Sequence, residues 1–421
     1  MFNPFRGGDA MRWSFLRQVL GIGAIVSILF MGCSTQSSLP GEPEQVSHEP
    51  QATTQAVATT IFEGTLPSGA LYKIWMPDDW NGELVVFAHG YVAVTEPVAI
   101  PESQLTLSDG TYIPDMVADM GYAFATTSYR ENGMAVQEGI VDLVELVYRF
   151  KDLFPEPEHT YLVGGSEGGL ITIKSTEMKH VYSGGLALCG PIGDFIRQIN
   201  YVGDFRVLFD YFFPGVLPGS PIAIPQYVID NWDEVYVPKI IQALKDYPDR
   251  AQQLIHCAKA AVDPDDPATV AQTTLTVLWY NVFATNDMVR RVGGNPYDNM
   301  DRTYRGSSND AYLNKNVQRF AADPQAVENA RRLFDTTGDL NVPVITMHTV
   351  ADPIVPAWHE RLYRGKVFPQ KPKIYYDNLF VMRYGHCNFT KEEVLDAFEK
   401  LVMKVKAFET FQIPTPTLVR H

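Results

Sequence analysis

The segment from residue 163 to residue 170 reads VGGSEGGL, so four glycines surround a single serine. Glycine has no Cβ and adopts strained or left-handed backbone at little cost. The three residues before the segment's first glycine, Tyr-Leu-Val, are typical of a short buried strand, and the apolar residues that follow Gly169 suit a helix. The segment therefore predicts a strand that turns at once into a helix, with Ser166 at the apex of the turn.

Residues 164–168 match the pattern G-x-S-x-G, the nucleophile elbow, in which the strand-to-helix turn exposes the serine hydroxyl. A glycine-rich surface loop is the alternative interpretation of so short a match. The elbow is favoured because the motif requires a strand before it and a helix after it, and the sequence provides both.

The composition indicates an ordinary globular protein. Of the 421 residues, 46% are apolar and 20% are charged. The length allows one large domain or a domain with an insertion. The formal net charge is -15 and no long basic run occurs, so nucleic acid is not an expected partner. No metal-ligand spacing stands out, and neither a metal nor a cofactor is expected.

The N-terminus has the pattern of an export signal. Three arginines precede an apolar run from residue 19 to residue 31, which is short for a membrane span but suits the core of a signal peptide. Cleavage after Gly32 and before Cys33, in LFMGCS, resembles the lipobox of bacterial lipoproteins. We therefore expect residues 1–32 to be a lipoprotein-type signal peptide and Cys33 to be lipidated. Ordinary secretory cleavage and a retained anchor are the alternatives.

A flexible tether is expected at residues 33–60. From residue 34 onward this stretch is mostly Ser, Thr, Gln, Pro, Glu and Ala, so it cannot bury enough apolar surface to fold. The lipoprotein resemblance implies export to the bacterial cell envelope and a lipid anchor in a membrane. Because Ser34 follows the cysteine, the resemblance points to the outer membrane in a cell that has one.

From about residue 61 the sequence alternates candidate strands and helices. The candidate strands are residues 71–76, 83–88, 122–127, 160–163, 185–189, 344–348 and 374–381, and the candidate helices between them are 135–153, 167–180 and 391–411. Several strands are continuous apolar runs, as in a sheet that is covered on both faces. The alternation predicts an α/β domain with a mostly parallel sheet, built from residues 61–190 and 336–421.

Residues 191–335 interrupt this alternation. They lack clear strand signals and contain helical patterns at 238–244, 249–261 and 324–334. We expect a mainly helical cap inserted over the carboxyl edge of the sheet. Its most apolar segment, residues 205–213, either lines a pocket or packs the cap onto the sheet.

A serine hydroxyl is a poor nucleophile, so it needs a neighbouring base, and the base needs a carboxylate that orients it. After an elbow these groups follow in the order Ser, acid, His. Asp352 follows the apolar run VPVITMHTVA, where a buried strand would end at the sheet edge. The alternatives are that Asp352 only caps a turn, or that Asp377 is the acid.

The base candidate is His386, in YGHCNFT, on a loop between the last strand and the last helix. Of the nine histidines, only His386 combines the required order with such a loop. His348 lies inside a strand and is expected to be a core residue.

The segment FAHGYVAV, residues 87–94, contributes the oxyanion site. After an elbow, one backbone N–H follows the nucleophile and another comes from the loop after an early strand. These positions correspond to Glu167 and Tyr91. The alternative is that His89-Gly90 is merely a turn.

HGY, GGSEGG, Asp352 and GHC, in that order, resemble the α/β-hydrolase fold superfamily of serine hydrolases, over roughly residues 61–411. Within it the chain resembles exported bacterial esterases and prolyl-oligopeptidase-like proteins. The resemblance implies helices on both faces of the sheet and no cofactor. Tannases and feruloyl esterases of this fold carry linked cysteines before the nucleophile and after the histidine. Here Cys387 follows the histidine, but Gly165 precedes the serine.

Three cysteines remain if Cys33 is lipidated, so at most one internal disulfide can form among Cys189, Cys257 and Cys387. The sequence leaves the pairing open.

The first functional hypothesis is a carboxylic ester hydrolase. The second is an aminopeptidase of the same fold, with cap carboxylates that bind the α-amine of a peptide substrate. The third is a non-catalytic surface lipoprotein. The complete set of triad candidates weighs against the third hypothesis, and esters are expected to be preferred because alkoxides leave more easily than amines.

Overall fold

The computed structural model describes residues 57–178 and 180–412. The predicted signal peptide, Cys33 and nearly all of the predicted tether lie outside these residues. The strands are β1 (Thr59–Thr65), β2 (Leu71–Pro77), β3 (Leu84–Ala88), β4 (Ala123–Thr127), β5 (Thr160–Gly165), β6 (Gly184–Leu188), β7 (Val344–Ala351) and β8 (Tyr376–Tyr384). The helices outside the cap are η1 (Glu102–Leu105), α2 (Ile113–Ala118), α3 (Val136–Leu153), α4 (Glu167–Met178), α12 (Trp358–Val367), η3 (Lys373–Tyr375) and α13 (Lys391–Gln412).

All eight strands form one sheet in the order β1-β2-β4-β3-β5-β6-β7-β8. Strand β2 runs antiparallel to both of its neighbours, and every other pair is parallel. The predicted α/β architecture with a mostly parallel sheet is therefore confirmed.

Helices cover both faces of this sheet, which explains the continuous apolar runs in its strands. Alternate residues of each strand point to opposite faces. Val86 and Leu162 pack in the same cluster as buried residues of α3 and α4. Their neighbours Val85 and Tyr161 pack against α2 and α13 on the other face.

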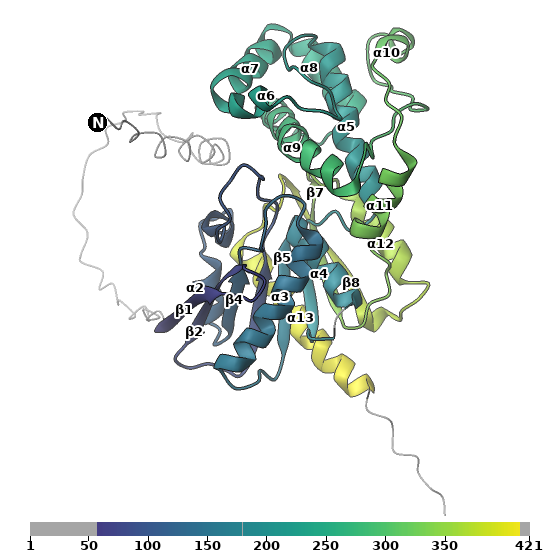
Figure 1. The fold of residues 1–421 in the computed structure, drawn as a ribbon. Coiled ribbons are helices and arrows are strands. Elements are labelled where there is room, and N and C mark those ends of the chain that lie inside the picture. The colour runs from purple at the N-terminus through teal and green to yellow at the C-terminus, as the bar shows by residue number, and fades with distance from the viewer. Residues whose placement is uncertain (1–56, 179, 413–421) are drawn as a thin grey trace, which may run out of the picture. The chain divides into compact units, whose positions relative to one another are not determined.

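A helical cap is inserted between β6 and β7 and lies beyond the ends of the strands (Figure 1). Its helices are α5 (Phe195–Phe212), α6 (Gln226–Asp230), η2 (Trp232–Tyr236), α7 (Val237–Asp246), α8 (Pro248–Ala258), α9 (Thr269–Val292), α10 (Asp310–Asn316) and α11 (Pro324–Phe334). The apolar segment that was expected to line a pocket or to pack on the sheet does neither. Phe205 and Phe209 are fully buried in an apolar cluster that belongs to the cap itself.

Several elements were not among the expected strands and helices, including β1, α2, α5, α9 and α12. Strand β1 begins at Thr59, inside the predicted tether, because this β-branched and aromatic segment pairs with β2 along its whole length. Helix α9 was not predicted, since it is rich in Thr, Val and aromatic residues, which are weak helix formers. Its buried Leu275, Leu278 and Val282 nevertheless have the helical spacing of three and four residues.

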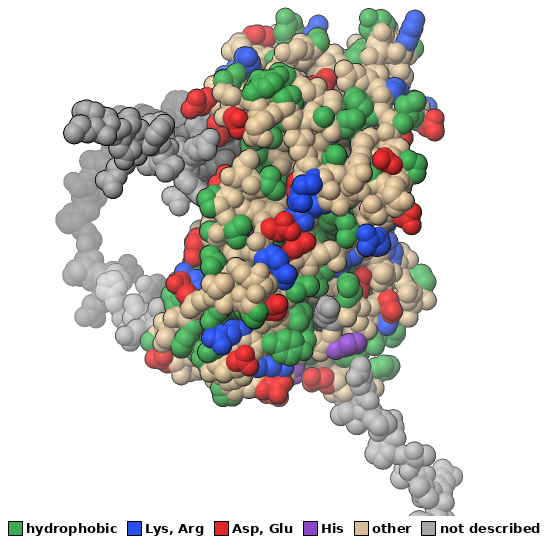
Figure 2. All heavy atoms as spheres, viewed as in Figure 1, with side chains coloured by type: hydrophobic (Ala, Val, Ile, Leu, Met, Phe, Trp, Pro, Cys, Tyr) green, Lys and Arg blue, Asp and Glu red, His purple; other side chains and the backbone are tan. Residues whose placement is uncertain are grey.

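The surface shown in Figure 2 has Lys and Arg side chains interspersed with Asp and Glu. Within the described residues, no helix combines the length and hydropathy needed to cross a bilayer.

Truncation of Phe209 tests whether the cap has its own core. Because the side chain is fully buried, Phe209→Ala should lower the free energy of unfolding by about 3–5 kcal/mol. Denaturant titration measures this loss. Phe411→Ala, whose side chain in α13 is 66% exposed, is the matched control and should change it by less than about 0.5 kcal/mol. Equal effects of the two substitutions would contradict the conclusion that Phe209 lies in a core of the cap.

Candidate active site

The turn between β5 and α4 places Ser166 at its apex with a left-handed backbone, at φ 57°. The glycines around it are required by close backbone packing. A Cβ at Gly168 would lie 1.9 Å from the carbonyl oxygen of Ala88, and one at Gly164 would lie 2.3 Å from the carbonyl oxygen of Gly168. No side chain fits at either position. The structure thus has the strand–turn–helix geometry that the motif predicts.

The three predicted triad residues come together at this turn. The Ser166 hydroxyl and His386 Nε2 are 2.8 Å apart, and His386 Nδ1 and Asp352 Oδ2 are 2.7 Å apart. Asp352 directly follows β7, and His386 lies on the loop between β8 and α13. With Nδ1 donating to the carboxylate, Nε2 is free to accept the serine proton. The rival acid, Asp377, instead pairs with Lys404 at 2.6 Å.

Asp352 is almost fully buried, and its carboxylate is held by several donors. Oδ1 accepts the backbone N–H groups of Ile354 and Val355 at 2.8 and 2.9 Å. Burial acts to raise the pKa of Asp352, but the charge of His386 and the hydrogen bonds from His348 and His386 outweigh it and lower the pKa to about 2. The carboxylate is therefore ionised at neutral pH.

The strand order, the single reversed strand β2, the turn at Ser166 after β5, the acid after β7 and the histidine after β8 together define the architecture. The chain has the α/β-hydrolase fold.

The loop after β3 lies beside the nucleophile, since a Cβ at Gly90 would be 3.2 Å from the Cβ of Ser166. Gln104 holds this loop: its Oε1 accepts the Gly90 N–H at 2.7 Å and its Nε2 donates to the Tyr91 carbonyl at 3.2 Å. In the described part of the chain, neither the Tyr91 N–H nor the Glu167 N–H donates to another group. Both are available as the oxyanion donors that the sequence suggested. No sequence signal pointed to Gln104.

A cavity of about 120 Å³ between the cap and the sheet edge reaches Ser166. Its walls are largely apolar and include Phe195, Ile199 and Val202 of α5 and Ala284 and Met288 of α9.

Tyr280 of α9 is a polar cap residue that lies beside Ser166. It lines the cavity, it packs 5.9 Å from the ring of Tyr91, and its hydroxyl interacts with Ser166. Tyr280 was not predicted from the sequence because the helix that carries it, α9, was not predicted. The helical spacing of the apolar residues in α9 was the available signal.

The Glu167 side chain also lines the cavity. Both of its oxygens are buried and make no well-formed hydrogen bond among the described residues, although the backbone N–H of Ala135 lies near the carboxyl group. Burial raises the pKa of this carboxyl group well above its ordinary value, although the nearby charge of Arg291 opposes the rise. Arg291 itself is paired with Asp287 at 2.8 Å. The carboxyl group is therefore held in its neutral form.

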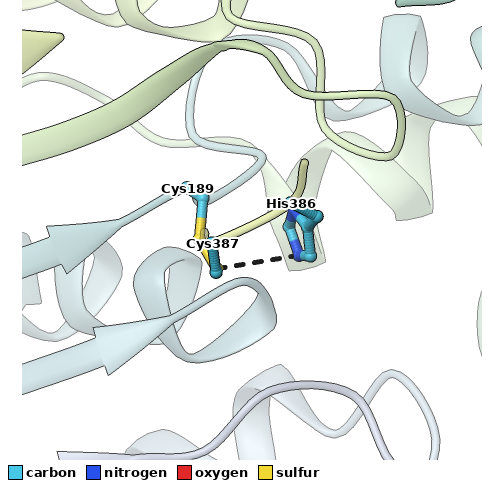
Figure 3. Close-up of side chains that lie close together, drawn as sticks. All are labelled: Cys189, His386 and Cys387. Atoms are coloured by element: carbon cyan, nitrogen blue, oxygen red, sulfur yellow. Dashed lines mark hydrogen bonds between the residues drawn. A yellow bond between two sulfur atoms is a disulfide. The ribbon is translucent and has the colours of Figure 1, made fainter. Parts of the chain in front are cut away.

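A disulfide joins Cys189, at the end of β6, to Cys387, next to the catalytic-site histidine (Figure 3). The sequence left this pairing open. Cys257 is the remaining cysteine of the described residues, and it is free and buried. The pairing differs from the tannase and feruloyl esterase pattern, because the partner of Cys387 comes from the neighbouring strand and not from position 165. The two sulfurs lie near His386, but a disulfide offers no thiolate, so this cluster is not a metal site.

Three comparisons with known proteins were made. No protein-family model matches the sequence. No curated protein matches it either. Similar solved structures include feruloyl esterase B from Aspergillus oryzae, at 15% identity and a TM-score of 0.47, covering 84% of this chain and 81% of that one. The esterase Pf2001 from Pyrococcus furiosus has 12% identity and a TM-score of 0.43, and the match covers 83% of this chain and 91% of the esterase.

The acylaminoacyl peptidase of Pyrococcus horikoshii is another similar structure, at 13% identity and a TM-score of 0.42. The match covers 85% of this chain but only 42% of the peptidase, so this chain spans less than half of that protein.

Substitution of Gly168 tests the packing of the elbow. The Cβ of Gly168→Ala would meet the main chain of β3, so the free energy of unfolding should fall by at least about 3 kcal/mol. Gly365→Ala is the matched control. No atom lies within 4 Å of its Cβ, it is inside α12, and it should be neutral or stabilising by up to about 1 kcal/mol. Thermal unfolding of both variants measures the difference. Equal stability of the two would contradict the close approach.

Proposed function

We propose that this protein is a serine hydrolase that cleaves carboxylic esters. The observation that carries the proposal is the continuous hydrogen-bonded chain from Ser166 through His386 to Asp352, at the inner end of an apolar cavity. This arrangement contains a nucleophile, a base and a group that orients the base, and it places them where an acyl group would bind.

In the proposed reaction, the Ser166 oxygen attacks the carbonyl carbon of the ester while His386 Nε2 takes the serine proton. Asp352 stabilises the imidazolium that forms. The negative charge on the carbonyl oxygen is stabilised by the N–H groups of Tyr91 and Glu167. When the tetrahedral intermediate collapses, His386 returns the proton to the leaving alkoxide, and the acyl group remains on Ser166.

Water then attacks the acyl-enzyme and gives its proton to the same histidine. The second tetrahedral intermediate releases the carboxylic acid and returns the proton to the Ser166 oxygen. Both halves of the reaction use the same oxyanion donors.

The cavity favours small apolar acyl groups. An apolar cavity of about 150 Å³ holds one benzene molecule. The cavity here has about 120 Å³ and mainly apolar walls, so it suits a short or branched aliphatic acyl group or a single aromatic ring. Long unbranched acyl chains exceed it.

A substrate panel tests the proposal. p-Nitrophenyl esters of short acyl groups should have a higher kcat/KM than aminoacyl and prolyl p-nitroanilides. Ser166→Ala and His386→Ala should each lower kcat by on the order of 10⁴-fold with little change in the melting temperature. Ser175→Ala is the matched control, since it removes a buried hydroxyl from the same helix α4. Full activity in Ser166→Ala would refute the assignment, and an inert wild-type protein would favour a non-catalytic role.

An aminopeptidase of this fold is the second candidate, and Glu167 is the observation that favours it. Its buried carboxyl group, which is neutral in the free protein, would give up its proton and pair with the α-ammonium group of a peptide substrate. Three acidic residues of the cap are exposed and do not line the cavity, namely Asp230, Asp233 and Glu234. Anilide turnover equal to ester turnover, and lost selectively in Glu167→Gln, would support the peptidase.

We also propose that the mature protein is a lipid-anchored envelope protein. The lipobox-like LFMGCS sequence around Cys33 supports this proposal. Cys33→Ser should move the protein from the membrane fraction to the soluble fraction or leave it unprocessed. Cys257→Ser, which removes the free buried thiol, should leave fractionation unchanged. A mature N-terminus without lipid, located at another residue by mass spectrometry, would contradict the proposal.

A further inference from the structure

A second histidine lies behind the triad. His348, in β7, is fully buried, and its Nε2 is 3.5 Å from Asp352 Oδ2. This is the same carboxylate oxygen that pairs with His386 Nδ1 at 2.7 Å. Both imidazole rings therefore lie against one oxygen of Asp352, His386 through a hydrogen bond and His348 through a longer electrostatic contact.

A second carboxylate holds the other side of His348. Glu360, from α12, is fully buried, and its Oε1 is 3.3 Å from His348 Nδ1. Its Oε2 accepts hydrogen bonds from Thr346 and from the Tyr376 hydroxyl, the latter at 3.1 Å. These contacts fix Glu360 in place.

Both nitrogens of His348 face acceptors. Nε2 donates to the Val355 carbonyl at 2.7 Å, and Nδ1 faces the Glu360 carboxylate. The two hydrogen bonds that Glu360 Oε2 accepts favour the carboxylate form, and beside a carboxylate the ring is satisfied only when both of its nitrogens carry protons. Such a ring is an imidazolium.

The charge balance of the cluster also indicates that His348 is an imidazolium. Two buried carboxylates without a cation between them would carry a large desolvation cost. Burial lowers the pKa of His348, but hydrogen bonds and attraction from Asp352 and Glu360 outweigh it and raise the pKa to about 10.

Two other buried titratable groups beside this site, His359 and Tyr201, do not provide the missing positive charge. Burial lowers the pKa of His359, on α12, so this ring is neutral, and its Nδ1 accepts the Gly193 N–H. The hydroxyl of Tyr201, on α5, donates to the Pro353 carbonyl at 2.6 Å. His348 is thus the cation of this buried cluster.

We propose that His348 is a positioning residue that remains an imidazolium at neutral pH and fixes the Asp352 carboxylate toward His386. The inference rests on the proposed hydrolase function. The resulting chain runs Ser166, His386, Asp352, His348, Glu360, with charges that alternate in sign from Asp352 onward.

The sign of the effect follows from this alternation. The positive charge of His348 offsets part of the attraction of Asp352 for a proton on His386. Without it, His386 is protonated more readily, and the acid limb of the pH–rate profile moves to higher pH. Removal of the negative charge of Glu360, with His348 in place, has the opposite effect.

The test measures how fast a fluorophosphonate labels Ser166 as a function of pH. This probe reports the activation of the serine whatever the natural substrate is. In His348→Gln the acid limb should move up by about half to one pH unit, and labelling on that limb should slow by about threefold to tenfold. In Glu360→Gln the limb should move down.

A matched control comes from His159, which also lies between two carboxylates. It pairs with Glu83 at 2.5 Å and with Glu409 at 2.9 Å, at the start of β5 and away from Ser166. His159→Gln should lower the melting temperature and leave the acid limb unmoved.

The outcomes separate the two proposals. If the wild-type protein is not labelled, the hydrolase proposal fails. If it is labelled and the acid limb of His348→Gln matches that of His159→Gln, the positioning role is overturned. Should the His348 variant not fold, histidine ¹⁵N spectra of the wild-type and Glu360→Gln proteins decide. A doubly protonated ring at pH 8 that responds to Glu360→Gln supports the role, and its absence refutes it.

Discussion

The contact between the start of α4 and the end of β3 determines where everything else in this molecule must lie. At Gly168 the helix approaches the Ala88 carbonyl so closely that no side chain fits between them. This approach forces the left-handed backbone at Ser166 and directs its hydroxyl beyond the strand ends. The loops after β3, β7 and β8 then need only short extensions to reach that hydroxyl. The geometry of the site is thus a consequence of packing in the centre of the sheet.

The loop that carries His386 is held on both sides. Before it, the Gly385 N–H donates to the Ala351 carbonyl at 3.2 Å, and the Thr349 hydroxyl donates to the Gly385 carbonyl at 2.5 Å. After it, the disulfide fixes Cys387 to the end of β6. A base that is restrained in this way loses little conformational entropy when it takes up its reactive orientation.

Parts of this arrangement could be predicted from the sequence, because they depend on chain order. Ser166, Asp352 and His386 each follow a strand, and parallel strands bring their carboxyl ends to one edge. Contacts between side chains distant in sequence could not be predicted. The apolar run around His348 correctly predicted a buried strand residue, but nothing in the run shows that the Asp352 carboxylate contacts the ring. The partner of Cys387 was hidden for the same reason, since the sequence does not show that β6 lies beside the His386 loop.

Helix α9 was also missed, and it connects the parts of the site. Phe283 accepts the Tyr91 hydroxyl at 2.9 Å, beside the oxyanion donors. The hydroxyls of Thr273 and Tyr384 are hydrogen-bonded at 2.8 Å, and Tyr384 is the last residue of β8, before the loop that carries His386. Asp287 accepts the Met134 N–H at 2.9 Å.

These three hydrogen bonds join the cap to the side chain of Tyr91, to the end of β8 and to the loop before α3. A rigid-body swing of the cap away from the sheet would break all three together. Movement of the cap is therefore coupled to the loops around Ser166, and a substrate that displaces the cap also disturbs the groups that are proposed to act on it.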